Sequence, residues 1–358
     1  MSITTRRAHA SSLLLLTAPI AIGLDWYAPE RHTWIFFTSV LAILPLAWYI
    51  GRATEQLADR FGGGIGGLLN ATFGNITELI IGAFALRAGL VDLVKASLTG
   101  SIIGNVLLVF GLCALVGGLK HPVQRFNRTA AGLGATMLLL SAIALIVPAV
   151  FHHVSQRDHT PELRLETAIA GVLLVTYCAS LVFTLKTHRH IAGVPTHAKG
   201  TPGDYWPAIL TLVASTAAVA WMSELLVGAV SSAAQSLGMS QLFVGVVVLA
   251  IVGNAAEHYS AVVMAWQNKM DAAIAIAIGS STQIALFVAP VLVFLSYAIA
   301  PVAMDLRFTI FEVVAIGLAV LTIAMIAHDG ETHWMEGVQL LAVYAVLVLG
   351  FYYLPVPG

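Results

Sequence analysis

The sequence predicts an all-α integral membrane protein of about 11 transmembrane helices, with one N-terminal helix before two inverted five-helix repeats. Three observations predict this class. The 358 residues are 59% hydrophobic and only 10% charged, a composition unlike that of soluble domains. Apolar runs close to the ~20 residues that a transmembrane helix needs recur along the chain. The second half also repeats polar positions of the first half at a fixed shift.

Charged or Pro/Gly-rich breaks separate the candidate membrane spans. The spans lie near residues 11–27, 33–51, 64–87, 93–118, 130–150, 164–186, 208–235, 240–265, 271–299, 306–327 and 334–354. The first one follows Arg6 and Arg7 and therefore also fits the charged and apolar regions of a signal peptide. The segments between spans that lie on the same side as the N-terminus carry, together with it, 11 Lys and Arg, and those on the other side carry 6. The positive-inside rule then predicts a cytoplasmic N-terminus.

These spans divide the chain into four parts. We expect an extra N-terminal helix at 1–30, a first five-helix repeat at 31–186, a cytoplasmic linker at 187–206 and a second five-helix repeat at 207–358. The linker is rich in Pro, Gly and His and has no helical periodicity. Its loosely spaced histidines are typical of solvated loop residues rather than metal ligands.

Composition also excludes several functions. The formal net charge of −1 leaves no basic surface for nucleic acid. The glycine run at 62–67 lacks the Gly-Lys-Ser/Thr ending of a nucleotide-binding loop. Cys113 and Cys178 lie inside apolar runs, which excludes a disulfide framework. We therefore expect no nucleic acid, no nucleotide, no cofactor and no enzymatic activity.

The internal repeat appears when the chain is shifted by 179 residues against itself. Gly74-Asn75 then falls on Gly253-Asn254, Glu78 on Glu257 and Ser101 on Ser280, without a gap. The shift covers five predicted spans, an odd number, so the second copy enters the membrane in the opposite orientation. Inverted repeats are typical of secondary transporters, whose substrate site lies near the membrane midplane between the repeats.

Two glutamates within the membrane are the strongest functional signal. A carboxylate at the centre of a span costs ~2.5–3.5 kcal/mol on insertion scales, so a symmetry-related pair requires a reason. An asparagine three residues before each glutamate shares its helix face. Together these groups form a pocket of oxygen donors, which suits Ca²⁺. The predicted ion ligands are Glu78, Glu257, Asn75, Asn254, Gly74 and Gly253.

Other polar residues of the spans are candidates for an ion pathway. They are Ser101, Asn105, Ser280, Gln283 and Glu224. A serine in a membrane helix often bonds its own turn instead, and Glu224 equally fits a place at the membrane interface. We expect Glu312, near the start of its span, to be an interface residue.

At these residues the chain resembles a known family. Gly-Asn-Ile-Thr-Glu-Leu (74–79) with Val-Lys-Ala-Ser-Leu-Thr-Gly-Ser-Ile-Ile-Gly-Asn (94–105) resembles the first repeat of the Ca²⁺/H⁺ antiporters of the calcium/cation exchanger superfamily. Gly-Asn-Ala-Ala-Glu-His (253–258) with Gly-Ser-Ser-Thr-Gln-Ile-Ala-Leu (279–286) resembles the second. The resemblance implies the calcium/cation exchanger fold and implies that Glu78 and Glu257 exchange Ca²⁺ for protons. It also implies that the matching asparagines, serines and Gln283 line the path, although Gln283 falls on Gly104 at the repeat shift.

Charge balance gives the expected mechanism. Two ionised carboxylates offset one Ca²⁺ and two protonated ones are also nearly neutral, whereas the empty dianion is penalised in the membrane. Obligatory exchange by alternating access, with at least two protons per Ca²⁺, follows. A third proton would need another group, for which Glu224 is the candidate.

Three other functions remain open from the sequence. A Na⁺-coupled Ca²⁺ exchanger could use the same scaffold, although the dual Gly-Asn-x-x-Glu motif and His258 resemble the proton-coupled branch. A Mn²⁺ or broad divalent cation exchanger fits the same donors. A cation channel is less favoured, because channels usually close their carboxylate rings from several subunits. We expect Ca²⁺, protons and the lipid bilayer as partners, and a bacterial plasma membrane as the location.

Overall fold

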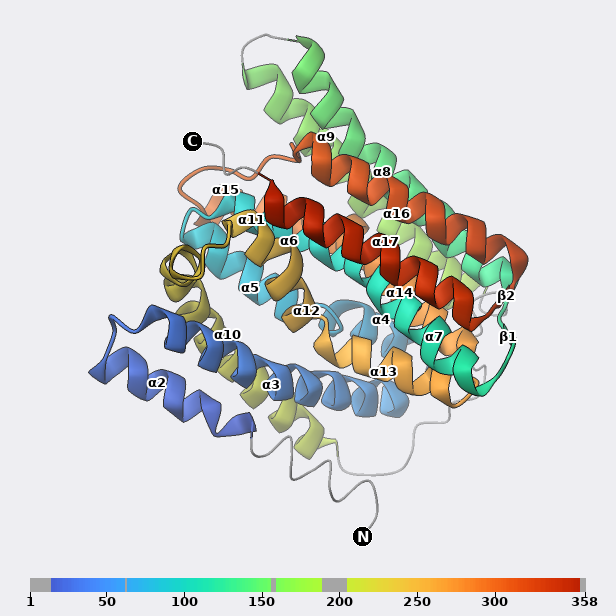
Figure 1. The fold of residues 1–358 in the computed structure, drawn as a ribbon, viewed down its shortest axis with the longest axis horizontal. Coiled ribbons are helices and arrows are strands. Elements are labelled where there is room, and N and C mark those ends of the chain that lie inside the picture. Colours follow the sequence, from blue (N-terminus) through green and yellow to red (C-terminus); the bar gives the residue numbers. More distant parts are fainter. Residues whose placement is uncertain (1–13, 62, 156–158, 189–204, 355–358) are drawn as a thin grey trace.

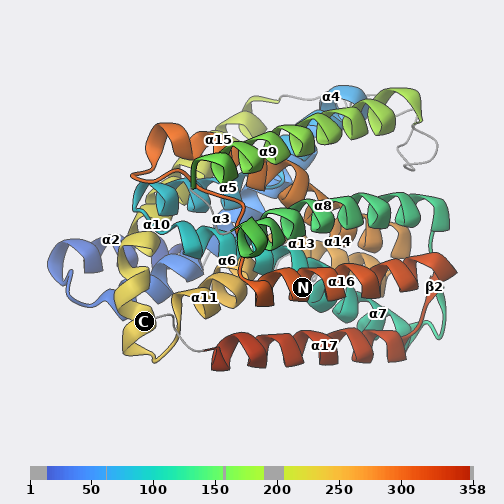
Figure 2. The ribbon, with the colours of Figure 1, turned by 90° about the horizontal axis from the view of Figure 1, so that it is seen from above.

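The computed structural model describes residues 14–61, 63–155, 159–188 and 205–354, almost all of them helical. The helices pack into one elongated bundle around a continuous apolar core (Figure 1). Seen from above, α9 (His159–Val182) and α17 (Trp334–Tyr353) lie at opposite edges of the bundle (Figure 2). Between them lie α6 (Val91–Ile103) and α14 (Met270–Gln283). The structure thus confirms the predicted all-α membrane fold.

The first part of the chain builds one set of helices. Its remaining α-helices are α2 (Thr17–Tyr27), α3 (His32–Phe61), α4 (Gly63–Phe73), α5 (Ile76–Arg87), α7 (Phe110–Lys120) and α8 (Arg128–Ser155). Two π-helical stretches, η1 (Gly104–Val109) and η2 (Phe183–Thr187), continue α6 and α9.

The second part builds a related set. Its remaining α-helices are α10 (Trp206–Ser236), α11 (Gln241–Phe243), α12 (Ala250–Gly253), α13 (Ala255–Trp266), α15 (Ala289–Ile299) and α16 (Ile310–Asp329). The π-helical stretches are η3 (Val244–Leu249) and η4 (Ile284–Val288). Strands β1 (Gln124–Arg125) and β2 (Glu331–Thr332) pair antiparallel, with Gln124 opposite Thr332.

Ten of the predicted spans have a counterpart in the described residues. Nine helices are long and apolar enough to cross a membrane, and a tenth span, 241–266, is bent by 62° at its break. The first predicted span, 11–27, begins outside the described residues and continues as α2. Most of the predicted linker, 189–204, also lies outside them.

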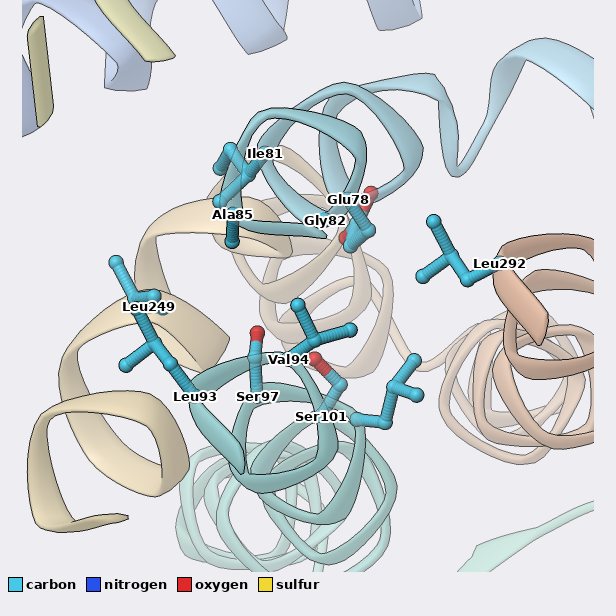
Figure 3. Close-up of a pocket in the computed structure, with 11 residues that line it drawn as sticks. Glu78, Ile81, Gly82, Ala85, Leu93, Val94, Ser97, Ser101, Leu249 and Leu292 are labelled. Atoms are coloured by element: carbon cyan, nitrogen blue, oxygen red, sulfur yellow. The ribbon is translucent and has the colours of Figure 1, made fainter. Parts of the chain in front are cut away.

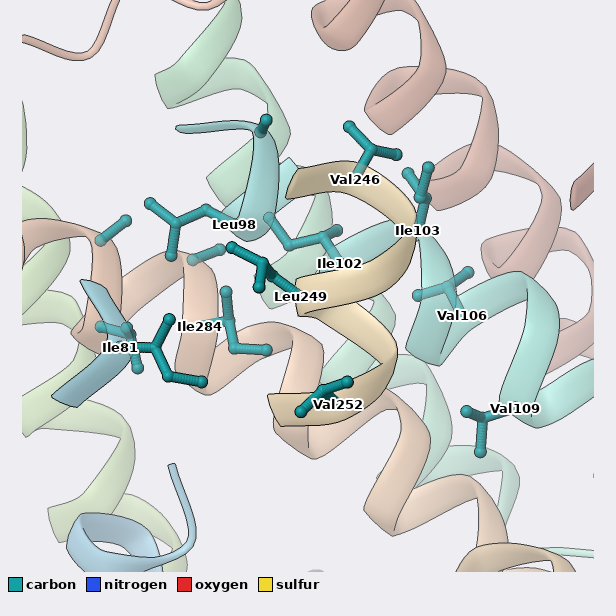
Figure 4. Packing of buried hydrophobic residues seen from close by; sticks show 14 of the residues in the cluster. Ile81, Leu98, Ile102, Ile103, Val106, Val109, Val246, Leu249, Val252 and Ile284 are labelled. Atoms are coloured by element: carbon teal, nitrogen blue, oxygen red, sulfur yellow. The ribbon is translucent and has the colours of Figure 1, made fainter. Parts of the chain in front are cut away.

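The two repeats come into close backbone contact where α6 crosses η3. A Cβ placed on Gly100 would collide with the carbonyl oxygen of Val246, and one placed on Gly245 would lie 2.5 Å from Cβ of Ala96. Apolar side chains, Ile102 and Leu249 among them, fill the space beside this crossing (Figure 4). Residue 100 must therefore be glycine for the backbones of α6 and η3 to be in direct contact.

A buried ion-pair network fixes one end of α6. Lys95 donates to Oδ1 of Asp305 at 3.0 Å and to the carbonyl oxygen of Arg307 at 2.9 Å. Arg307 Nη2 lies 2.7 Å from the other carboxylate oxygen of Asp305. Burial alone would raise the pKa of Asp305, but the charges of Lys95 and Arg307 hold that pKa below its usual value. The network ties the start of α6 to the connection before α16.

Glu312 lies in the first turn of α16 but is buried, so the expectation of an interface residue whose carboxylate snorkels to the surface is wrong. The residue is 2% exposed. Its carboxylate accepts hydrogen bonds from N–H and Oγ1 of Thr309, at 2.9 and 2.8 Å, in the capping box that begins α16. It also accepts one from Thr99 of α6 at 3.0 Å. Thr309 followed three residues later by Glu312 is the sequence pattern of a capping box.

We predict that Gly100→Ala lowers the free energy of unfolding in detergent by roughly 1–3 kcal/mol, the usual range for overpacking. The added methyl group would collide with the Val246 carbonyl. Gly279→Ala is the matched control, since Gly279 is the repeat equivalent of Gly100 but has no neighbouring atom within 4 Å of where a methyl group would be added. Thermal unfolding of both variants measures the effect. Equal midpoints for the two variants would contradict the close crossing.

Candidate functional site

Each repeat contains a helix that breaks at a Gly-Asn step. Asn75 separates α4 from α5 with φ −105° and ψ 21°, and Asn254 separates α12 from α13 with φ −95° and ψ 8°. Both values depart from helical geometry at repeat-equivalent residues. As a result, Glu78 and Glu257 lie in the first turns of α5 and α13. Unpaired backbone N–H groups at a helix start favour negative charge there.

Each glutamate lies against the glycine of the opposite repeat. A Cβ placed on Gly253 would be 3.1 Å from Cγ and 3.3 Å from Oε1 of Glu78. One placed on Gly74 would be 3.6 Å from Oε1 of Glu257. The absence of a side chain at Gly253 makes room for Glu78, whereas the 3.6 Å at Gly74 is an ordinary van der Waals distance. The structure therefore brings these four predicted residues together across the two repeats.

Two buried oxygens at the start of α5 have no partner among the described residues. Asn75 donates its amide Nδ2 to Oε1 of Gln283, while its own Oδ1 accepts no hydrogen bond from any described residue. Oε2 of Glu78, one turn along the same helix, is also unpaired among the described residues. An unsatisfied buried polar atom costs about 1–3 kcal/mol. A cation or a proton at this position would satisfy both oxygens.

The amide of the second repeat is held by a chain of hydrogen bonds. Asn254 donates Nδ2 to Oγ of Ser101 at 2.9 Å and accepts from Nδ2 of Asn105 at 3.2 Å. Asn105 Oδ1 in turn lies 2.9 Å from Nε2 of His258, which donates to it when that nitrogen carries the proton. His258 was not among the predicted site residues. Its position four residues after Asn254, on the same helix face, was the available signal.

Asn105 and Gln283 play equivalent parts although they do not match at the repeat shift. Asn105 bonds Asn254 of the second repeat, and Gln283 bonds Asn75 of the first. The π-helical stretch η1 begins at Gly104, whereas η4 begins at Ile284, one residue later than a shift of 179 would place it. Asn105 thus lies inside η1, whereas Gln283 immediately precedes η4.

The two carboxylates have different surroundings. Glu78 is 9% exposed, whereas Glu257 is half-buried and accepts a hydrogen bond from Oγ of Ser280. Glu224 is exposed on α10, and no described contact joins it to either glutamate. Among the predicted pathway residues, the structure therefore gathers Ser101, Asn105, Ser280 and Gln283 at the site, and leaves Glu224 apart.

The donor set determines what this site can hold. No three His, Cys, Asp or Glu side chains cluster in the described part of the chain. An ion at the glutamates would instead meet two carboxylates with amide and hydroxyl oxygens. Such ligands suit hard cations such as Ca²⁺, which tolerate irregular coordination.

Comparison with known proteins gives consistent similarities. The sodium/calcium exchanger protein family model matches residues 31–186 and 207–353. The Ca(2+)/H(+) antiporter of Synechocystis sp. is 43% identical over 96% of this chain and 97% of its own length. The Ca(2+)/H(+) antiporter ChaA of Bacillus subtilis is 46% identical over 89% of this chain and 92% of its own length. The solved structure of native YfkE has a TM-score of 0.83 and 42% identity, covering 96% of this chain and 100% of that chain.

Proposed function

The chain belongs to the sodium/calcium exchanger protein family, and we propose that it is a secondary active antiporter of Ca²⁺ and protons. Two bacterial relatives are named Ca²⁺/H⁺ antiporters, and the alignment with this chain covers 97% and 92% of their lengths. Their bacterial origin supports a bacterial plasma membrane as the location. The family and its relatives transport ions, and a role in transport rather than catalysis follows.

The observation that carries the proposal is that each glutamate packs against a glycine of the opposite repeat. Each of them also lies in the first turn of a helix that follows a break in its span. The helix starts favour the ionised form, while the surrounding membrane penalises an uncompensated pair of charges. The pair therefore needs either one divalent cation or protons.

Exchange follows from this charge requirement. With Ca²⁺ bound, the two carboxylates and the unpaired Oδ1 of Asn75 supply oxygen ligands. When protons replace the ion, each carboxyl group becomes neutral and can donate a hydrogen bond. The Ca²⁺-bound and the doubly protonated protein can both change the side of the membrane to which the site opens. The same change with two uncompensated negative charges has a high free-energy cost. At least two protons are then exchanged for each Ca²⁺.

Alternating access would come from α3 and α10. These long helices lie side by side along one face of the bundle (Figure 1). The rest of the bundle is locked at the Gly100 crossing and at the Lys95 network. Movement of the α3–α10 pair against this frame would open the site to one side of the membrane at a time.

Two related functions make different predictions. A Na⁺-coupled exchanger would require a Na⁺ gradient, and a broad divalent exchanger would accept Mn²⁺ at the same oxygen ligands. We favour proton coupling with Ca²⁺, because two relatives that match 96% and 89% of this chain are named Ca²⁺/H⁺ antiporters.

We predict that proteoliposomes containing this protein take up Ca²⁺ along an imposed pH gradient in the absence of Na⁺. Glu78→Gln and Glu257→Gln should each lower this uptake at least tenfold, because an amide can neither ionise nor exchange a proton. Glu331→Gln is the control, since Glu331 is exposed and pairs with Arg125 on the surface strand. Its uptake should match that of the unmodified protein.

Two outcomes of this transport assay would contradict the proposal. Uptake that needs a Na⁺ gradient would make the protein a Na⁺-coupled exchanger. Uptake that survives both glutamine substitutions would remove the paired carboxylates from the mechanism. Competition by Mn²⁺ in the same vesicles measures the breadth of cation selectivity.

We also predict that Gly253→Ala raises the KM for Ca²⁺ several-fold. The new methyl group would lie 3.1 Å from Cγ of Glu78 and push its carboxylate from the opposite repeat. Gly317→Ala is the matched control, because no neighbouring atom lies within 4 Å of the position of its added methyl group. Ca²⁺ uptake measured across a range of concentrations tests this. Equal KM values for the two variants would contradict the crossed geometry.

A further inference from the structure

Tyr177 of α9 lies between the two elements that hold Asn75 and Gln283. Its side chain is buried, and its hydroxyl group donates a hydrogen bond to the carbonyl oxygen of Ala71 at 3.3 Å. Its ring stacks on that of Phe287, with the ring centroids 5.1 Å apart. Ala71 lies four residues before Asn75, and Phe287 lies four residues after Gln283. Tyr177 therefore contacts the chain on both sides of the Asn75–Gln283 hydrogen bond.

The break in the first repeat takes the helical partner away from the Ala71 carbonyl. In a continuous helix this oxygen would accept from the backbone N–H of Asn75. The helix α4 ends at Phe73, however, and the φ and ψ of Asn75 depart from helical geometry. Carbonyls in the last turn of a helix need other partners, and water does not supply them inside a membrane. The hydroxyl group of Tyr177 is that partner.

The second repeat satisfies the equivalent carbonyl in another way. Ala250 is the repeat equivalent of Ala71. Its carbonyl oxygen accepts from the backbone N–H of Asn254 at 3.3 Å and from the side-chain Nδ2 of the same residue at 2.9 Å. The repeat equivalent of Tyr177 is Val356, which carries no hydroxyl group. The first repeat thus uses a hydroxyl group of α9 where the second repeat uses the amide of its own asparagine.

This difference leaves the two asparagines with different free atoms. Because the Ala71 carbonyl has a partner from α9, Asn75 donates its Nδ2 to Gln283 instead. The Oδ1 of Asn75 is buried and accepts no hydrogen bond from any described residue. The corresponding oxygen of Asn254 accepts one from Asn105. Of the two amide oxygens, the one in the first repeat is therefore open to a cation.

We propose that Tyr177 is a positioning residue for the ion site, because its hydroxyl group caps α4 and so keeps the amide oxygen of Asn75 available to the ion. This inference deepens the proposed antiport function and rests on it. Without the hydroxyl group, the α4 carbonyl would take the Asn75 amide as its donor, as happens in the second repeat. The amide would then leave Gln283, and its oxygen would no longer be presented together with the carboxylate of Glu78. Tyr177 acts through Asn75 and supplies no ligand of its own.

Tyr177→Phe tests this role, because it removes the hydroxyl group and keeps the ring that stacks on Phe287. Tyr344→Phe is the matched control, since Tyr344 is also buried but its hydroxyl group has no partner among the described residues. Calorimetry on the purified, monodisperse protein gives the Kd for Ca²⁺, and pH-driven uptake into proteoliposomes gives KM and kcat. We expect Tyr177→Phe to raise Kd and KM at least threefold with kcat within twofold of the unmodified protein. Tyr344→Phe should leave all three values unchanged.

A double variant shows whether the effect of Tyr177 passes through Asn75. In a protein that carries Asn75→Ala, no amide remains for the hydroxyl group to control, so adding Tyr177→Phe should change Kd by less than 1.5-fold. A general loss of structure would instead lower the amount of active protein, and with it kcat, without raising KM.

Three results would overturn the role of Tyr177. They are an unchanged Kd in Tyr177→Phe, a fall in kcat with an unchanged KM, and an equal rise in Kd with and without Asn75→Ala. Absence of pH-driven Ca²⁺ uptake by the unmodified protein would instead contradict the proposed antiport. The failure of this inference and the failure of the proposed function are therefore distinguishable.

Discussion

The structure depends on one electrostatic constraint: two carboxylates inside a membrane protein must be neutralised together. Glu78 and Glu257 come from opposite repeats, and each lies against the backbone of the other repeat at Gly253 and Gly74. The low-dielectric surroundings make an uncompensated pair costly. Helix starts at both residues stabilise negative charge without removing that requirement. Either an ion or protons would neutralise the pair, and the proposed exchange rests on this choice.

Close backbone packing makes this geometry possible. Helices that break at Gly74-Asn75 and at Asn254 place Glu78 and Glu257 in the first turns of α5 and α13. The crossing of α6 and η3 at Gly100 holds the repeats at a distance that no larger residue would allow. Outside the site, Lys95 and Asp305 fix one end of α6 to the connection before α16. In the proposed mechanism, these contacts form the frame against which α3 and α10 would move.

Much of the fold and the central pair were predictable from the sequence, because the repeat shift and the apolar spans are one-dimensional patterns. These patterns identify the glutamates, their asparagines and the glycines. The place of Glu312 near the start of its span did not reveal that it is buried, because its burial depends on the capping box with Thr309 and on a bond from α6. The equivalence of Asn105 and Gln283 was hidden because Asn105 falls on Ile284 at the repeat shift, one residue after Gln283, and only their bonds to Asn254 and Asn75 reveal it. A small cavity beside Glu78 is lined by residues of α5, α6, η3 and α15 (Figure 3), and it could not be found from any single periodicity.

The number of protons released when Ca²⁺ binds tests the central claim most directly. The purified protein in detergent, at low buffer concentration, is titrated with Ca²⁺ while a pH indicator reports released protons and calorimetry reports binding. Competition for the same two carboxylates predicts release that approaches two protons per bound Ca²⁺ at acidic pH, together with Ca²⁺ affinity that falls as the pH falls. Ca²⁺ binding of constant affinity with no proton release across the same pH range would contradict the account.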